Sequence, residues 1–338
     1  MAPNEQTPFR ASSKAVTDRS GPISKSWFAS ISYPFSALQK QVGFKKTSSF
    51  IYFSITAGLF FAFCFYKADS VIHERWLKSA FFHKFWFSDG VMALFMQLHL
   101  RSVIPSGLMM PIQFLPAIRQ KYPRFHRYVG RLNLILLMSG SITAIVVAPR
   151  SFGGALETQI LVWVLAFLTI YSICRSWAGI RNKRIDEHRA WILRTWAYGG
   201  SVLTLRLCMM LFAAGAQFFS ANQYRSVTTC QEVLYLYESL NSSVTQVYAK
   251  YPVCANVTST MRTSPMVDLV VTPALGAGIE QRIAMLNLSF GVAGWAALVL
   301  NGAAVEIYLN ATKDEDARLK KVSAMRRKAA GLEGAKEE

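Results

Sequence analysis

Two short motifs in the chain place a histidine beside an arginine where a long apolar segment begins. Their sequences are FHRYVGR at 125–131 and EHRAWILR at 187–194, and each carries a second arginine four or five residues after the first. Histidine is scarce, with 5 in 338 residues, so composition alone does not explain the match. Imidazole nitrogens bind metals and haem iron, and guanidinium groups bind phosphates, haem propionates and lipid headgroups. The candidate ligand-binding residues are His126, Arg127, Arg131, His188, Arg189 and Arg194.

The segments that must position these motifs are long and apolar. The chain is 52% hydrophobic and 17% charged, whereas a soluble domain normally carries about 25% charged residues. Six runs are long enough to span a bilayer, which takes about 20 residues. They lie near 49–66, 91–115, 132–148, 159–180, 195–219 and 283–309. The sequence therefore predicts an all-α polytopic membrane bundle, with a four-helix core at 91–219 between a first span at 49–66 and a last span at 283–309.

The net charge of +18 follows a membrane topology and does not indicate a nucleic-acid partner. If the N-terminus is cytoplasmic, the inside segments are 1–46, 117–131, 181–194 and 313–338, and they carry most of the 37 Lys and Arg residues. This asymmetry predicts that both termini are cytoplasmic and that the basic segments lie near anionic lipid headgroups. We expect a disordered basic tail at 1–46 and a charged tail at 313–338. A mitochondrial transit peptide is the alternative interpretation of the Ser- and Arg-rich N-terminus.

The loop at 220–282 is predicted to lie on the lumenal or extracellular side. It contains glycosylation acceptors at Asn241 and Asn256, which are modified only on that side. Cys230 and Cys254 are the only cysteines outside the apolar runs, and a disulfide between them suits that compartment. We therefore expect a multi-pass glycoprotein of the endomembrane system or the plasma membrane.

His126 and His188 are predicted to lie at one depth on the cytoplasmic side, because spans three and five run in the same direction. If these helices are neighbours, the two imidazoles could bind one metal ion or one haem b between them. The adjacent arginines could then hold haem propionates or another anionic ligand. The alternative interpretation is that both motifs are interfacial anchors, with Tyr128 and Trp191 in the aromatic belt.

Two further ionisable residues, His99 and Arg206, lie inside predicted spans. Counted from the predicted span ends, both lie near the middle of the bilayer, where an unpaired ionisable group is costly. They are therefore candidates for binding a ligand or handling a proton. The alternative is that they form interhelical hydrogen bonds that fix the packing of the bundle.

The segment from His99 to Arg206 resembles a known family, the uncharacterised multi-pass membrane proteins of domain of unknown function 2306. The resemblance rests on a histidine in a span leading into PIQF at 111–114, followed by YPRFHRYVGR at 122–131 and HRAWILR at 188–194. The chain has Pro-Ile at 111–112 where the family typically has a glycine before the Gln-Phe pair. The resemblance implies a small helical bundle without an established reaction. Larger members of this sort resemble fungal proteins, some encoded among metabolite-pathway genes.

Three classes of function remain open. A haem-, metal- or anion-binding membrane protein would use His126 and His188. A membrane-embedded enzyme or transporter for a lipophilic metabolite, for example in a secondary-metabolite pathway, would use His99 and Arg206. An accessory membrane protein would carry out no chemistry. The sequence has no glycine-rich phosphate loop, dinucleotide fingerprint, His-Glu-x-x-His or Cys-x-x-Cys motif that would favour one enzyme class.

Overall fold

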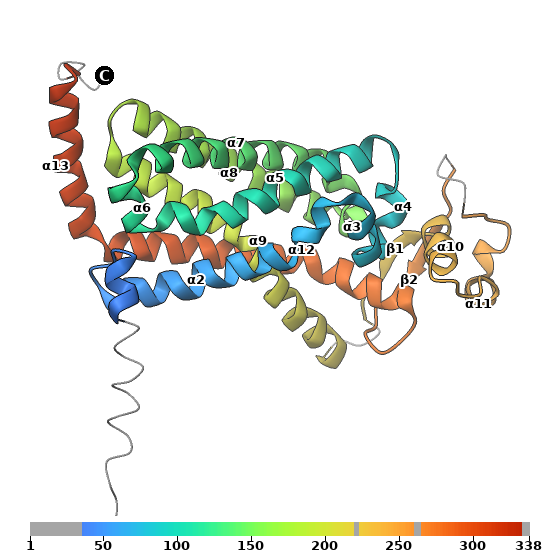
Figure 1. Cartoon of the computed structure of the whole chain (residues 1–338). Coiled ribbons are helices and arrows are strands. Elements are labelled where there is room, and N and C mark those ends of the chain that lie inside the picture. The colour runs from blue at the N-terminus through green and yellow to red at the C-terminus, as the bar shows by residue number, and fades with distance from the viewer. Residues whose placement is uncertain (1–35, 220–222, 260–264, 333–338) are drawn as a thin grey trace, which may run out of the picture.

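The computed structural model describes residues 36–219, 223–259 and 265–332, and long helices dominate it (Figure 1). Within these residues, six helices are long and apolar enough to cross a membrane. They are α2 (Thr47–Tyr66), α5 (Gly90–Phe114), α7 (Pro123–Val147), α8 (Leu156–Arg181), α9 (Ile185–Phe219) and α12 (Ile279–Ala311). The prediction of an all-α membrane bundle with six spans is therefore confirmed.

Two of these helices begin well before the apolar runs predicted from the sequence. Helix α7 begins at Pro123 and α9 at Ile185, whereas the spans were expected to begin near 132 and 195, so each helix starts nearly three turns earlier. Proline is favoured at the first position of a helix because its missing N–H has no intrahelical partner there. Asp186 and Glu187 in the first turn of α9 complement the positive end of the helix dipole. Both His-Arg motifs are consequently helical from their first residues.

The bundle is held together by close helix–helix packing. Helix α12 packs along α9 and α8, α5 packs along α7, and α8 joins the two groups, while α2 lies against α5. Glycines allow this approach, since a Cβ atom on Gly140 would overlap Val103 of α5 and one on Gly294 would overlap Leu161 of α8. In a membrane such close contacts supply much of the attraction between helices. The packed bundle therefore includes α12 as well as the four helices of the predicted core.

Short elements join the long helices at both ends of the bundle. Between α2 and α5 lie η1 (Ala68–Val71), α3 (His73–Ser79), η2 (Phe81–His83) and α4 (Lys84–Phe87). Helix α6 (Pro116–Lys121) joins α5 to α7, and η3 (Ala148–Arg150) and η4 (Phe152–Gly154) join α7 to α8. Buried aromatic rings of Trp76, Phe85 and Phe87 anchor the α3–α4 segment to the bundle.

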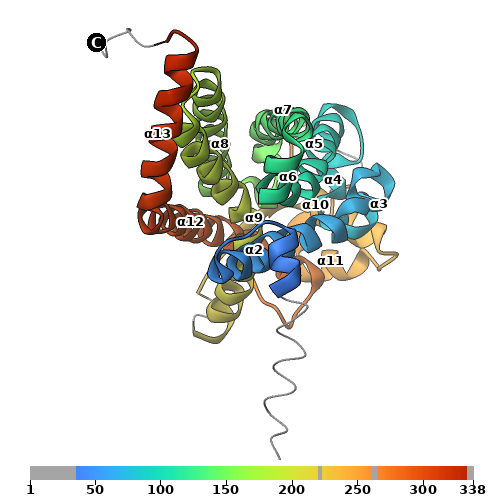
Figure 2. The same ribbon diagram turned by 60° about the vertical axis from the view of Figure 1, so that its left-hand side comes forward.

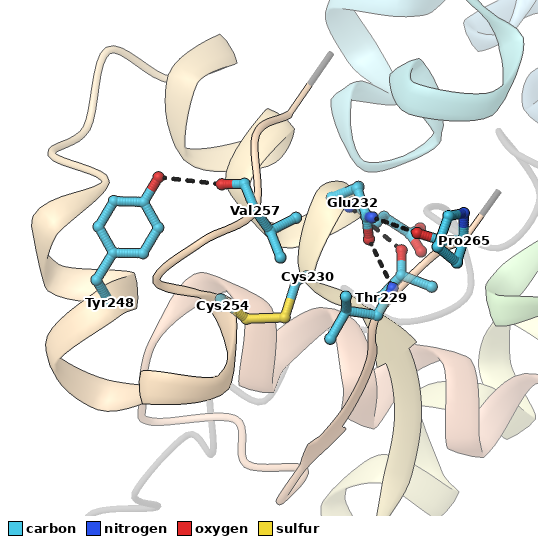
Figure 3. Close-up of a disulfide and its surroundings, with 9 residues drawn as sticks. Thr229, Cys230, Glu232, Tyr248, Cys254, Val257 and Pro265 are labelled. Carbon is cyan, nitrogen blue, oxygen red and sulfur yellow. Dashed lines mark hydrogen bonds between the residues drawn. A yellow bond between two sulfur atoms is a disulfide. The ribbon is translucent and has the colours of Figure 1, made fainter. Parts of the chain in front are cut away.

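A small domain follows α9 and caps one end of the bundle. It contains β1 (Ser226–Thr229), α10 (Cys230–Ser239), α11 (Thr245–Lys250), η5 (Pro252–Cys254) and β2 (Asp268–Val271), and the two strands pair antiparallel. Cys230 and Cys254 form a disulfide in its core, with Cα atoms 5.4 Å apart (Figure 3). Glu280 at the start of α12 is 4% exposed and accepts hydrogen bonds from Tyr237 Oη at 2.8 Å and Lys250 Nζ at 2.6 Å. This network fixes the domain to the bundle.

The opposite end of the bundle carries the basic segments, and we call it the basic end. It is formed by α6, the first turns of α7 and α9, and α13 (Lys313–Ala329), which runs across the helix ends (Figures 1 and 2). The start of α2 lies at the same end (Figure 1). Residues 36–46 of the predicted disordered tail are folded, with a helix at 36–41 and Gln39 bonded to Phe44 and Thr47. Residues 1–35 lie outside the described residues, and so does 333–338 of the predicted charged tail.

Candidate functional site

The two motif histidines occupy equivalent positions at the basic end. Each is the fourth residue of its helix, His126 in α7 and His188 in α9. The two side chains interact electrostatically with one another and with Arg119 of α6. The structure therefore brings His126 and His188 to one site, as their sequence positions suggested. It adds Arg119, which lies outside both motifs and carried no sequence signal beyond belonging to a basic segment.

The ring of His188 is fixed by α8. Its Nδ1 atom lies 3.0 Å from the Ser176 carbonyl oxygen and 2.9 Å from Ser176 Oγ. A carbonyl oxygen only accepts, so Nδ1 carries the proton and Nε2 of the neutral ring carries the free lone pair. Helices α8 and α9 can approach this closely because Gly179 has no side chain, and a Cβ there would lie 3.0 Å from the His188 backbone nitrogen. Ser176 could not be predicted as the partner, because no sequence pattern links it to His188.

His126 has a buried nitrogen without a partner. Its Nδ1 atom makes no hydrogen bond within the described residues, although water cannot reach it. Buried polar groups in folded proteins nearly always find a partner, so this nitrogen is available to bond a further group. Gln113, at the end of α5, is in the same condition, since its Nε2 atom is also buried and unpartnered.

Arg189 completes the cluster from α9. It donates from Nη2 to Thr312 Oγ1 at 2.7 Å, and its guanidinium lies 5.8 Å from the centre of the Tyr308 ring. Arg119 interacts electrostatically with Arg189 and Tyr308. Glu315 of α13 lies close to both arginines, but it is held by Arg318 in a two-bond ion pair at 2.7 Å. Hydrogen bonding from Arg318, with smaller contributions from Arg189 and Arg119, lowers the pKa of Glu315.

Ion pairing separates the arginines of the basic end into two groups. Arg194 forms a two-bond ion pair with Glu306 at 2.6 and 2.9 Å, and Arg184 pairs with Glu187 at 2.8 Å. Within the described residues, neither Arg119 nor Arg189 forms an ion pair. Arg119 and Arg189 therefore interact with the carboxylate of Glu315 only over a longer range, since Glu315 is paired with Arg318.

The other arginines of the first motif lie outside the cluster. Arg127 and Arg131 are exposed on α7. Arg127 donates from Nε to the Pro123 carbonyl of its own helix at 3.2 Å. Of the arginines singled out in the sequence, Arg189 follows His188 on α9 and interacts electrostatically with Arg119, while Arg194 is paired to Glu306 of α12.

His99 and Arg206 do not form a common site. His99 Nδ1 donates to the Gly140 carbonyl of α7 at 2.8 Å, which is an interhelical hydrogen bond of the packing kind. Arg206 lies over the rings of Phe152 and Phe290, at 5.3 and 5.8 Å. Arg206 lies 21 residues after Ile185, the first residue of α9, which is about 30 Å along the helix. The Phe152 ring beside it belongs to η4, the short element between α7 and α8. The depth of Arg206 in the bilayer stays a prediction.

At the far end of the bundle, the predicted modification sites lie on the small domain. Asn241 and Asn256 are both exposed, so the structure leaves each acceptor accessible. Among the described residues, no group of three or more His, Cys, Asp or Glu side chains is placed to hold a metal ion.

The fold and the basic-end cluster together define a six-span integral membrane protein with a polar site at one end of its helices. Residues 96–237 match the sequence model of a family described as "Predicted membrane protein (DUF2306)", which confirms the resemblance drawn from the motifs. That segment contains both His-Arg motifs, His99 and Arg206.

Two further comparisons bear on the chain. It is 25% identical over 234 residues to a protein of Aspergillus versicolor named "Ava biosynthesis cluster protein G", covering 59% of this chain. The match spans 64% of the length of that relative. No solved structure matches the chain.

Proposed function

We propose that this protein binds the anionic group of an amphipathic molecule at the basic end, between the first turns of α7 and α9. The observation that carries the proposal is that Arg119, which forms no ion pair among the described residues, interacts electrostatically with His126, His188 and Arg189. Like charges held close together are unfavourable unless an opposite charge joins them. A carboxylate or phosphate would supply that charge and accept from two guanidinium groups at once.

The surroundings favour a ligand with a hydrocarbon part. On α9, Ile192 and Trp196 lie one and two turns deeper than His188. Together with Phe114, next to Gln113 at the end of α5, they belong to one apolar cluster. The relative from Aspergillus versicolor is named for a biosynthesis cluster. By analogy with this relative, we propose that the ligand is a lipophilic, acidic intermediate of a biosynthetic pathway. We propose that it binds at the cytoplasmic face of an endomembrane or the plasma membrane.

Binding of stearate to the full chain in phosphatidylcholine nanodiscs tests the proposal. Isothermal titration calorimetry, with empty nanodiscs as the blank, should show saturable binding of stearate and none of octadecanol, which has no charge. Arg119→Gln and Arg189→Gln should each weaken stearate binding about tenfold or more, because hydrogen bonds to charged groups contribute about 1.5–3 kcal/mol.

Arg127→Gln is the matched control, since Arg127 lies at the same end but is exposed and bonded only to its own helix. It should change the dissociation constant of stearate less than twofold. An equal loss in Arg127→Gln and Arg119→Gln would mean that the basic end attracts anions only through its overall charge, and the proposed site would be rejected.

A metal or haem shared by the two histidines is the second candidate, and the His188–Ser176 hydrogen bond favours it. Histidines that bind metals usually donate the other ring N–H to a carbonyl or carboxylate, which fixes the ring as it is fixed here. If the shared group is haem, purified protein shows a visible absorbance band that His188→Ala and His126→Ala each abolish. A spectrum without such a band, after expression with added haem precursor, would remove the haem candidate.

A further inference from the structure

The face of α7 that turns toward α5 carries small and polar residues at helical spacing. His126, Gly130 and Asn133 follow one another along this face from the basic end inward. Gln113 of α5 crosses over Gly130, where a Cβ atom would lie 3.0 Å from Gln113 Oε1. One turn deeper, Ser106 Oγ of α5 donates to Asn133 Oδ1. A polar line therefore leads from the proposed anion site into the bundle.

This line contains buried hydrogen-bonding groups that the described residues do not satisfy. Asn133 is 2% exposed and Ser106 is fully buried, yet Asn133 Nδ2 has no partner within the described residues. Gln113 Nε2 and His126 Nδ1, which lie one and two turns nearer the basic end, also lack a hydrogen-bond partner within the described residues. Unmatched polar groups are rare inside proteins and are still more unfavourable within a membrane, where polar side chains usually face one another or a ligand.

The side chains beside this line are apolar. Leu134 and Leu137 of α7 pack with Met110 of α5 and Trp196 of α9 in one buried cluster. A hydrocarbon chain beside this line would meet these apolar side chains and, among them, the polar pair of Asn133 and Ser106. The pair therefore favours a molecule that is apolar except at one interior point.

We propose that Asn133, positioned by Ser106 and supported by Gln113, binds an oxygen function within the hydrocarbon part of the ligand. This inference rests on the proposed function and names its ligand class, an oxygenated long-chain acid. His126 and Asn133 are seven residues apart, which corresponds to about 10 Å along the helix. An extended carbon chain has bonds of about 1.5 Å set at an angle to its axis, so it advances about 1.3 Å per bond. Over this distance, the oxygen of the ligand lies about eight carbons from its acid group. An amide both donates and accepts, so a hydroxyl group satisfies it in either orientation.

Comparison of stearate with 10-hydroxystearate tests this inference in the same nanodisc assay. Wild-type protein should bind the hydroxylated acid about fivefold more tightly, the gain expected of one added hydrogen bond. Asn133→Leu should abolish this preference while changing the binding of stearate less than twofold. Ser141→Ala is the matched control, because Ser141 is buried on the same helix but bonds only to the Leu137 carbonyl at 2.8 Å, and it should keep the preference.

The outcomes separate this inference from the function on which it rests. Equal binding of the two acids by wild-type protein, or a preference that survives in Asn133→Leu, would overturn the oxygen site while leaving the anion site intact. Absence of stearate binding would refute the anion site, and the oxygen site with it. If Asn133→Leu does not fold, Gln113→Met gives the same readout from the end of α5, and a full preference in that variant would count against the inference.

Discussion

Replacement of Ser323 by alanine should detach α13 from the basic end. Ser323 is 5% exposed, and its Oγ accepts from the backbone N–H of Ile185 at 2.8 Å and donates to Asp186 Oδ1 at 2.6 Å. The first N–H groups of a helix have no intrahelical partner, so Ser323 acts as a cap for α9 although it lies far away in the chain. The variant loses the cap and one hydrogen bond to a carboxylate.

The expected loss follows from these contacts. Removal of a helix cap costs about 1 kcal/mol, and a hydrogen bond to a charged group adds about 1.5 kcal/mol. With partial replacement of both by water, we expect docking of α13 to weaken by about 2 kcal/mol, or roughly 30-fold. Hydrogen exchange should therefore accelerate by about that factor in the amides of 313–329 that open with undocking, while exchange in α5 and α7 stays unchanged.

Met325→Ala is the control for this experiment, because Met325 lies on the same helix and is 62% exposed. It should leave the exchange of α13 unchanged. If Ser323→Ala exchanges at the wild-type rate throughout 313–329, the hydrogen bonds to α9 do not hold α13, and the positions of Glu315 and Arg318 in the site lose their support.

The remaining predictions concern the far end of the bundle. Joint replacement of Cys230 and Cys254 by serine removes a disulfide with a sequence separation of 24, which should destabilise the small domain by about 3 kcal/mol. Proteolysis should therefore cut 226–271 faster in this variant while the bundle stays intact. Equal rates of cleavage in the variant and the wild-type protein would contradict the prediction. Asn241→Gln and Asn256→Gln should each remove one glycosidase-sensitive mobility step, and no shift from either would place this domain in the cytoplasm. Burial, with the charge of Arg206, lowers the pKa of His83 to about 3, so the unfolded chain gains a proton below about pH 6.5 that the folded chain does not. The free energy of unfolding should fall by about 2 kcal/mol between pH 6.5 and 5. In melting experiments, His83→Phe should remove this loss of stability. If the variant loses stability with falling pH as steeply as the wild-type protein, another group causes the loss.

The six spans could be predicted from the sequence because each is a long and mostly apolar run, and length and composition decide whether a segment crosses a bilayer. The helix starts could not be predicted in the same way. The first turns of α7 and α9 contain charged residues that lower the apolar signal, although Pro123 and the acidic pair after Ile185 are favourable at helix starts.

The site itself depends on contacts that no local pattern encodes. Arg119 reaches His126 from the neighbouring short helix, and Ser176 reaches His188 from the helix before it. Glu315 reaches the cluster from α13. Spacing within the motifs identified the histidines, but it also selected Arg127 and Arg131, which lie outside the cluster. The tertiary packing decides which arginine of a basic segment lies beside the histidines.

The two motifs begin as near-copies, yet the packing gives them unequal roles. On α9 the second motif is covered, since Arg194 is paired with Glu306 and Arg189 is bonded to Thr312. On α7 the first motif stays uncovered, and Arg119 beside it is exposed as well. A ligand that reaches the two histidines would therefore approach from the α6–α7 side and meet Arg119 first. The α9 side, braced by α12 and α13, would form the fixed wall against which its anionic group is held.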